Sequence, residues 1–211
     1  MKYKLPKEVT DIVNKFEKTG FRIYIVGGAV RDLIMKKSVN DWDFTTDAKP
    51  EEILMLLPDG FYDNNFGTVG FNTELGIFEI TTMRKEGDYQ DRRHPDKINW
   101  TDKIEDDLAR RDFTINAIAL AVTPAKAGVQ STDRLLDSRL RGNDNVIDPF
   151  NGIQDIKDKI IRAVGDSEKR FKEDALRLIR AIRIATQLDF EIESNTSKAI
   201  SKNVSLIKDI A

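Results

Sequence analysis

The sequence predicts an α+β fold, in which a small mixed, mainly antiparallel sheet is flanked by helices and followed by a helical segment. Three stretches lead to this expectation. Residues 21–47 read as a strand, a Gly27-Gly28 turn, a short helix and a second strand. Residues 67–83 read as a hairpin, and residues 167–188 carry the longest helical pattern.

Length and composition are typical of a soluble globular protein. The chain has 211 residues, of which 40% are hydrophobic and 33% charged, so it can bury a sizeable core. No stretch approaches the roughly 20 apolar residues that cross a bilayer, and no cysteine is present for a disulfide or a thiolate metal site. Because the N-terminus also lacks the apolar run of a signal peptide, we expect a cytoplasmic protein with no membrane partner.

Net charge and histidine content limit the kinds of binding and catalytic site that the chain can form. The formal net charge is -2, so a nucleic-acid partner would need local basic patches. His94 is the one histidine, which excludes a His-rich zinc site and favours a solvated loop residue over a Ser-His-Asp triad.

The N-terminal region predicts two helices around the 21–47 stretch. Apolar side chains recur at helical spacing over residues 7–19, namely Val9, Ile12, Val13 and Phe16. Gly20 supplies the C-terminal stop of this amphipathic helix. After the second strand, Asp47 is expected to cap a helix over about residues 50–57.

The 21–47 stretch places two chemical features side by side. On its second strand Asp41 and Asp43 share one face while Trp42 and Phe44 face the core, because strand side chains alternate. Two carboxylates on one face outline a metal site. The glycine turn lets backbone N–H groups approach an anion, and the helix that follows adds the positive end of its dipole.

The middle of the chain offers further polar candidates. Glu79 lies on the second strand of the hairpin, where it is either a third site carboxylate or a solvated side chain. Residues 84–100 are polar and lack an apolar period, so we expect a mobile loop of the kind that often forms a lid. Arg110, Arg111 and Asp112 follow a short helix, where they form either a surface charge cluster or a triphosphate grip.

Residues 124–145 look foreign to their surroundings. They have mixed charge and no sustained period, and they separate two plausible strands at residues 115–122 and 146–147. A long insert at a hairpin tip costs little closure entropy, so we expect an insertion that leaves the fold unchanged. PAKAGVQ and LDSRLRGND within it resemble translated palindromic repeat elements that land inside bacterial reading frames.

The C-terminal region is helical. One helix is expected over residues 167–188, with a buried stripe formed by Phe171, Ala175, Leu178, Ile179 and Ile182. Asp174 and Arg177 are three residues apart and therefore neighbours, with Arg180 and Arg183 at the same interval. Taken alone, this pair is typical of an intrahelical salt bridge. A last helix is expected over residues 194–210.

Six motifs together resemble the catalytic head of class II tRNA nucleotidyltransferases. They are GGAVRD (27–32), DWDFTT (41–46), EITTMR (79–84), RRDFTINA (110–117), DPFNG (148–152) and EDALRLIRAIR (173–183). That family includes CCA-adding enzymes and bacterial poly(A) polymerases and is part of the DNA polymerase β superfamily. The resemblance implies a polymerase β-like head over residues 1–147, with the insert in a hairpin loop. It implies a truncated helical neck over residues 148–211, with the body and tail absent.

The same resemblance implies the chemistry of the site. Asp41 and Asp43 would hold two Mg²⁺ ions, one for the RNA 3'-hydroxyl and one for the triphosphate, with Glu79 as a third carboxylate. The nucleotide would be bound by two groups of residues. Gly28 and Arg31 would bind the triphosphate, and Arg111 and Asp112 would address the phosphate and ribose.

The resemblance also assigns the nucleobase to the helix after residue 171. Asp174 would accept the exocyclic amino hydrogen of cytosine or adenine, and Arg177 would donate to the ring nitrogen. Uracil and guanine reverse this pattern and would leave unpaired polar groups. Arg180 and Arg183 would support the pocket or the phosphates.

The expected function is template-independent transfer of CMP and AMP from CTP and ATP to the 3' end of tRNA. NAI at 116–118 and EDA at 173–175 favour a CCA-adding enzyme over a poly(A) polymerase of the same family, and a full-length 84–100 loop favours addition of the terminal A. A truncated, catalytically idle fragment that retains nucleotide binding is the other alternative. A separate polypeptide that supplies the missing body is a further expected partner.

Overall fold

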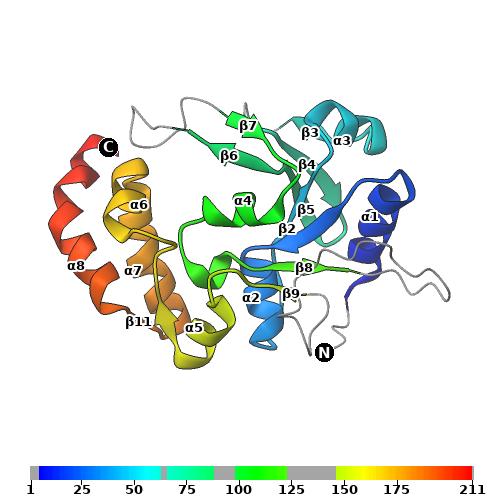
Figure 1. Cartoon of the computed structure of the whole chain (residues 1–211). Coiled ribbons are helices and arrows are strands. Elements are labelled where there is room, and N and C mark those ends of the chain that lie inside the picture. The colour runs from blue at the N-terminus through cyan, green and yellow to red at the C-terminus, as the bar shows by residue number, and fades with distance from the viewer. Residues whose placement is uncertain (1–4, 63–65, 88–97, 123–145, 211) are drawn as a thin grey trace.

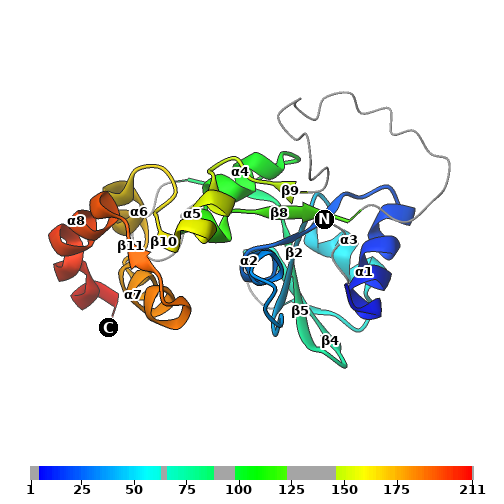
Figure 2. The same cartoon turned by 90° about the horizontal axis from the view of Figure 1, so that it is seen from below.

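A computed structural model describes residues 5–62, 66–87, 98–122 and 146–210 (Figure 1). The helices α6, α7 and α8 gather at one end of the molecule, and α1 and α3 lie at the opposite end beside the large sheet (Figures 1 and 2). None of the helices in these ranges has the length and apolar character that a membrane crossing requires.

The large sheet is mixed and mainly antiparallel, as expected. Its strand order is β3-β4-β5-β2-β1-β8-β9 within the described residues. Within the described part of this sheet, β2 and β5 are the one pair of neighbouring strands that runs parallel. The strands in that order are Phe61–Tyr62, Thr68–Thr73, Gly76–Thr82, Trp42–Thr46, Ile23–Val26, Ala119–Ala121 and Val146–Ile147.

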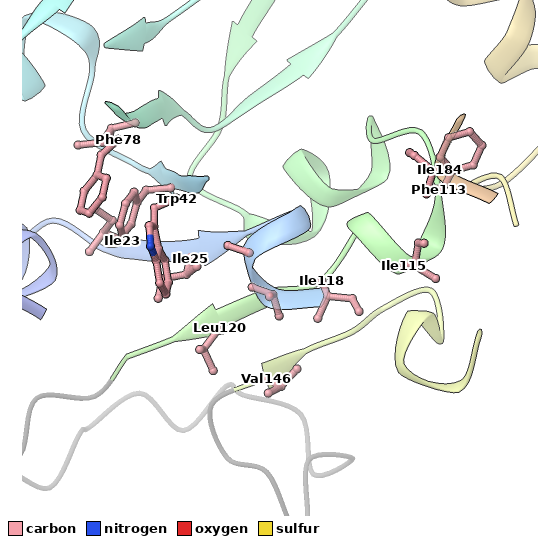
Figure 3. Close-up of a cluster of buried hydrophobic side chains, with 14 of the residues drawn as sticks. Ile23, Ile25, Trp42, Phe78, Phe113, Ile115, Ile118, Leu120, Val146 and Ile184 are labelled. Atoms are coloured by element: carbon pink, nitrogen blue, oxygen red, sulfur yellow. The ribbon is translucent and has the colours of Figure 1, made fainter. Parts of the chain in front are cut away.

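Side-chain alternation on β2 separates the core from the polar face. Trp42 and Phe44 are 4% and 1% exposed and pack against Phe78, whereas Asp43 between them is half-buried. Figure 3 shows Trp42 and Phe78 beside Ile23 and Ile25 of β1. Asp41 lies just before the first residue of β2 rather than on the strand, and it is exposed.

The N-terminal helices flank the sheet. Helix α1 (Lys7–Lys18) buries the apolar stripe that was expected, and Gly20 follows it at φ 90°. Helix α3 (Pro50–Leu56) begins after Lys49, whose backbone N–H donates to the Glu52 carboxylate at 2.8 Å. The expected cap by Asp47 is therefore wrong, because that carboxylate accepts from the backbone and guanidinium of Arg22.

The hairpin of β4 and β5 is confirmed, and a second hairpin follows it. Strand β6 (Arg84–Glu86) pairs antiparallel with β7 (Ile98–Trp100). The expectation of a loop without secondary structure over residues 84–100 is therefore wrong at both ends. Residues 88–97, including His94, lie outside the described residues.

The segment that follows leads back into the large sheet. Helix α4 (Ile104–Ala109) and the 3₁₀ helix η1 (Thr114–Asn116) precede β8, which pairs antiparallel with β9. The insert at residues 124–145 lies between these two strands and outside the described residues. Helix α5 (Gly152–Asp158) then packs on η1.

The C-terminal helical region differs from the single helix that was expected. Helix α6 (Ser167–Glu173) ends at Asp174, whose backbone is extended at φ -140° and ψ 106°, and α7 (Leu176–Leu188) begins two residues later. Of the expected stripe, Phe171, Ala175 and Leu178 are fully buried, but Ile179 and Ile182 are 45% and 53% exposed. Their assignment to the core is wrong because the break at Asp174 resets the register of the helix face.

The chain closes with short elements around α7. Strands β10 (Ile160–Ile161) and β11 (Glu191–Ile192) pair in parallel, and α8 (Ser194–Asn203) packs against α6. The last expected helix is two elements, because the 3₁₀ helix η2 (Val204–Ile210) continues α8. In Figure 3, Phe113 lies beside Ile184, so the core of this region is continuous with the residues before β8.

Candidate active site

Asp43 is the carboxylate around which the predicted site is gathered. Burial raises its pKa, Asp41 raises it further, and the charges of Arg111 and Arg180 oppose the shift. Asp41 is therefore close enough to interact with Asp43, although it sits on exposed backbone before the strand. A carboxylate such as Asp43, whose pKa is raised by burial and by a neighbouring carboxylate, favours a bound cation, because a cation relieves both effects.

Glu79 lies directly across from Asp43 on the parallel strand β5. Both residues line a cavity of about 210 Å³, together with Thr68, Thr81 and Arg111. Within the described ranges, no group of three His, Cys, Asp or Glu residues stands close enough to form a complete metal site.

The glycine turn and Arg111 come together over a long distance in sequence. Gly27 has φ 70°, and a Cβ at this position would lie 2.9 Å from Nη1 of Arg111 and 3.5 Å from Oδ2 of Asp43. The positive φ therefore favours glycine at this position, and a Cβ here would make the end of the Arg111 side chain shift. Among the described side chains, Arg111 Nε is the buried polar atom left without a hydrogen bond. An anionic ligand beside Gly27 would supply an acceptor.

A second cavity of about 230 Å³ joins the turn to the C-terminal helices. It is lined by seven of the residues to which the family resemblance assigns a role: Gly28, Asp43, Arg111, Asp112, Asp174, Arg177 and Arg180. Gly27, Arg110 and Asn116 complete the lining. Residues from four distant parts of the chain thus surround one hollow of a size that admits part of a nucleotide.

Two predicted residues lie beside this cavity rather than on its wall. Arg31 on α2 (Gly28–Ile34) donates from Nη1 to Asn116 at 2.9 Å and from Nε to Asp32 at 2.9 Å. Arg183 on α7 is exposed and is not among the described lining residues. Arg31 is connected to the cavity through its hydrogen bond to Asn116, and Arg183 is exposed to solvent.

Asp174 and Arg177 form a long ion pair across the break between α6 and α7, in place of the close intrahelical salt bridge that their spacing suggests in isolation. Arg177 Nη1 lies 3.1 Å from Glu173, whereas its Nε is 3.9 Å from Asp174. Asp174 Oδ1 instead accepts from the backbone N–H of Leu176 at 2.9 Å and so begins α7. Burial raises the pKa of Asp174, while Leu176 and the arginines at 177 and 180 oppose the shift.

Sequence reasoning missed Asp107, which is fully buried in α4. Its Oδ1 accepts from Arg110 at 2.9 Å and its Oδ2 from Arg111 at 3.4 Å. Burial raises its pKa, but the two arginines and the backbone N–H of Arg84 outweigh burial and lower it. The i,i+3 and i,i+4 spacing of DDLARRD was the available signal.

The family follows from these motifs and this geometry. Residues 23–162 match the family described as the poly A polymerase head domain, and the chain belongs to that family. The resemblance expected from the six motifs is confirmed. Members of this family are nucleotidyltransferases, which normally use a divalent metal.

Individual relatives sharpen the comparison. The CCA-adding enzyme of Lactobacillus helveticus is 41% identical over 201 residues, which are 95% of this chain and 45% of the relative. The crystal structure of the Bacillus stearothermophilus CCA-adding enzyme in complex with CTP superposes with a TM-score of 0.79 at 33% identity, covering 97% of this chain and 45% of that chain. A tRNA nucleotidyltransferase complexed with a primer tRNA and an incoming ATP analog gives 0.65 at 30% identity, covering 94% and 50%. The chain therefore spans about half the length of these relatives.

Proposed function

We propose that this chain carries the nucleotide-binding and catalytic part of a tRNA nucleotidyltransferase that adds CMP and AMP, from CTP and ATP, to the tRNA 3' end. The observation that carries the proposal is the cavity in which the Gly27-Gly28 turn, Asp43 and Arg111 meet Asp174 and Arg177. The solved relatives described as bound to CTP, or to a primer tRNA and an ATP analog, support it. We assign residues 1–147 to the head and 148–211 to the start of the neck.

In the proposed reaction the 3'-oxygen of the RNA attacks the α-phosphorus of the nucleotide. The bond from that phosphorus to the bridging oxygen breaks, and pyrophosphate leaves. Asp41 and Asp43 would hold two Mg²⁺ ions, with Glu79 across the sheet as a third carboxylate; these ions would lower the pKa of the attacking hydroxyl and neutralise the triphosphate. The chain's own contribution is then positioning and charge stabilisation.

The triphosphate would lie along the glycine turn. Gly28 offers backbone close to the ligand, and a Cβ there would lie 3.5 Å from Nη2 of Arg31, so this arginine lies beside the turn. Arg111 approaches from the opposite side and has an unsatisfied buried N–H within the described structure. Asp112, next to it, accepts from Arg180 and would address the ribose.

The base would be read by Asp174 and Arg177. Arg177 is 6% exposed and is held by the carbonyls of Arg110 and Arg170 and by Glu173. A guanidinium has five N–H donors, so donors remain for the ring nitrogen of cytosine or adenine. The fixed guanidinium and the adjacent carboxylate support selection of C and A without a template, and exposed Arg183 would act on phosphates at the rim.

Two experiments test this function. First, CTP and ATP with Mg²⁺ should raise the melting temperature of the purified chain, UTP should raise it less, and Asp43→Ala should reduce the effect. No shift with any nucleotide would overturn nucleotide binding. Second, a tRNA lacking its 3' end should be extended to CCA when CTP and ATP are supplied together; a long A tail would instead identify a poly(A) polymerase.

The second experiment also tests whether extension of tRNA needs a separate polypeptide as a partner. Because the relatives are about twice as long, binding without extension would identify an idle or incomplete catalytic part. Adding the C-terminal half of a CCA-adding relative as a separate polypeptide should then restore extension. Failure to restore it would favour the idle fragment.

A further inference from the structure

Asn116 occupies a position that joins the two ends of the proposed nucleotide site. It is the last residue of η1, is 7% exposed, and lines the cavity that also contains Gly28 and Arg180. Asn116 belongs to the RRDFTINA motif, but the residues around it do not indicate which role its side chain has. The hydrogen bonds of its side-chain amide do indicate a role.

The side-chain amide of Asn116 has two different partners. Its Oδ1 accepts from Nη1 of Arg31 at 2.9 Å, and its Nδ2 donates to Oδ1 of Asp112 at 3.2 Å. Arginine can only donate and a carboxylate accepts, so the chemistry of the partners fixes which end of the amide faces each. A carboxylate of the same shape would face Asp112 with like charge. An apolar group would remove one hydrogen bond from Arg31, which keeps Asp32, and one from Asp112, which keeps Arg180 and the backbone N–H of Phe113.

The chain of contacts continues to the nucleobase helix. The other oxygen of Asp112 accepts from Nε of Arg180 at 2.8 Å, and Nη2 of Arg180 lies 2.8 Å from the same oxygen. Arg31 stands on α2 beside the glycine turn, and Arg180 stands on α7 beyond Arg177. One buried amide therefore lies between the arginine of the phosphate end and the arginine of the base end.

We infer that Asn116 is a positioning residue that holds Arg31 and, through Asp112, Arg180 in one fixed relation, so that triphosphate and base are gripped together. The inference rests on the proposed nucleotide site. A buried polar group costs free energy unless its partners are in place, so the network has one low-energy arrangement. Losing the amide should free both arginines to move independently.

The test uses CTP binding to the full chain with Mg²⁺, measured by calorimetry. Asn116→Leu, which removes both hydrogen bonds, and Asn116→Asp, which keeps the shape but opposes Asp112, should each raise the Kd by about tenfold. The matched control is Asn203, a buried asparagine on α8 whose Nδ2 donates to the Ala199 carbonyl at 2.8 Å. Asn203→Leu and Asn203→Asp should lower stability and leave the Kd unchanged.

A double-mutant cycle separates positioning from a merely structural role. In the parent chain, the effects of Arg31→Lys and Arg180→Lys on the Kd should be non-additive by about threefold or more. In the Asn116→Leu chain the same two changes should be additive. If Asn116→Leu does not fold, the cycle is run in Asn116→Asp, which has the same volume.

The outcomes are distinguishable. If the parent chain does not bind CTP, the proposed function and this inference fall together. If it binds CTP but the Asn116 variants keep its Kd, or the coupling between Arg31 and Arg180 survives them, this inference alone is overturned.

Discussion

Asp107 lies completely buried beneath Arg111, with its Oδ2 3.4 Å from Nη2 of that arginine. Its other oxygen binds Arg110, so one carboxylate holds two of the arginines that line the cavity. Asp107→Asn should lower the free energy of unfolding by about 3 kcal/mol, because it removes the buried counter-ion of Arg111 and one of the two carboxylates that pair with Arg110, which keeps Glu86. Urea unfolding measures this loss of stability. As a control, Asp106→Asn removes a solvated contact with Lys85 and should cost less than about 1 kcal/mol. Equal losses of stability in the two variants would contradict the role of Asp107 as a buried counter-ion.

The same carboxylate predicts a dependence on pH. The pKa of Asp107 lies below its ordinary value of 3.8, so its contribution to stability is present above that value and is lost as pH falls through the lower, folded pKa. The stability difference between the parent chain and Asp107→Asn should therefore be constant from pH 5 to 7 and shrink below about pH 4. Asp43 and Asp174 have raised pKa values and the opposite sign, but both are present in the two proteins and cancel. A difference that grows toward acid pH would refute the prediction.

Gly152 is required by packing and not by its backbone angles. A Cβ at this residue would overlap the backbone oxygen of Thr114 and lie 2.7 Å from its carbonyl carbon, so η1 would have to move. Gly152→Ala should cost about 3 kcal/mol, at the upper end of overpacking, because backbone cannot yield as a side chain does. It should also weaken CTP binding, since η1 carries Asn116.

Gly165 provides the comparison for this prediction. It has φ 68° and open space around the position of a Cβ, so Gly165→Ala should cost only the backbone term of about 1–2 kcal/mol. CTP binding should not change in this variant. A smaller loss at Gly152 than at Gly165 would show that η1 yields.

The break before α7 predicts unequal effects for neighbouring apolar residues. Leu178 is fully buried, so Leu178→Ala should cost about 2–5 kcal/mol. Ile179 and Ile182 are about half exposed, so Ile179→Gln and Ile182→Gln should change stability by less than about 0.5 kcal/mol. Chemical denaturation of the three variants checks this. A large loss of stability at either isoleucine would instead support the uninterrupted buried stripe that helical periodicity alone predicts.

Much of the sheet and the face on which Asp43 lies could be predicted because their signals are local, whereas Asp41 was expected on the same strand and lies just before it. Alternation of Trp42, Asp43 and Phe44 assigns the faces of β2, and the turn at residues 74–75 fixes the register of its hairpin. The parallel pairing that sets Glu79 opposite Asp43 is a property of strand order, which no local pattern contains.

The rest of the site depends on tertiary contacts. EDALRL consists of strong helix formers apart from its aspartate, so the local sequence favours an unbroken helix. The extended backbone of Asp174 depends on its bond to Leu176 and on the anchoring of Arg177 on the Arg110 carbonyl. Aspartate often caps helices, but the carboxylate of Asp47 accepts hydrogen bonds from Arg22 instead. The approach of Arg111 to Gly27 likewise joins residues far apart in sequence.

Base selection provides the sharpest test of Asp174. Asp174→Asn keeps the oxygen that accepts from Leu176, so α7 should begin where it does now, but the amide adds a donor that uracil can use. The preference for CTP over UTP should therefore fall by about tenfold to a hundredfold, mainly because UTP binds better. Calorimetric Kd values for the two nucleotides measure the ratio. Asp189, at the other end of α7, is 96% exposed and already left-handed, so Asp189→Asn should preserve both the fold and the ratio. An unchanged ratio in Asp174→Asn would remove this residue from base recognition and leave Arg177 to act without it.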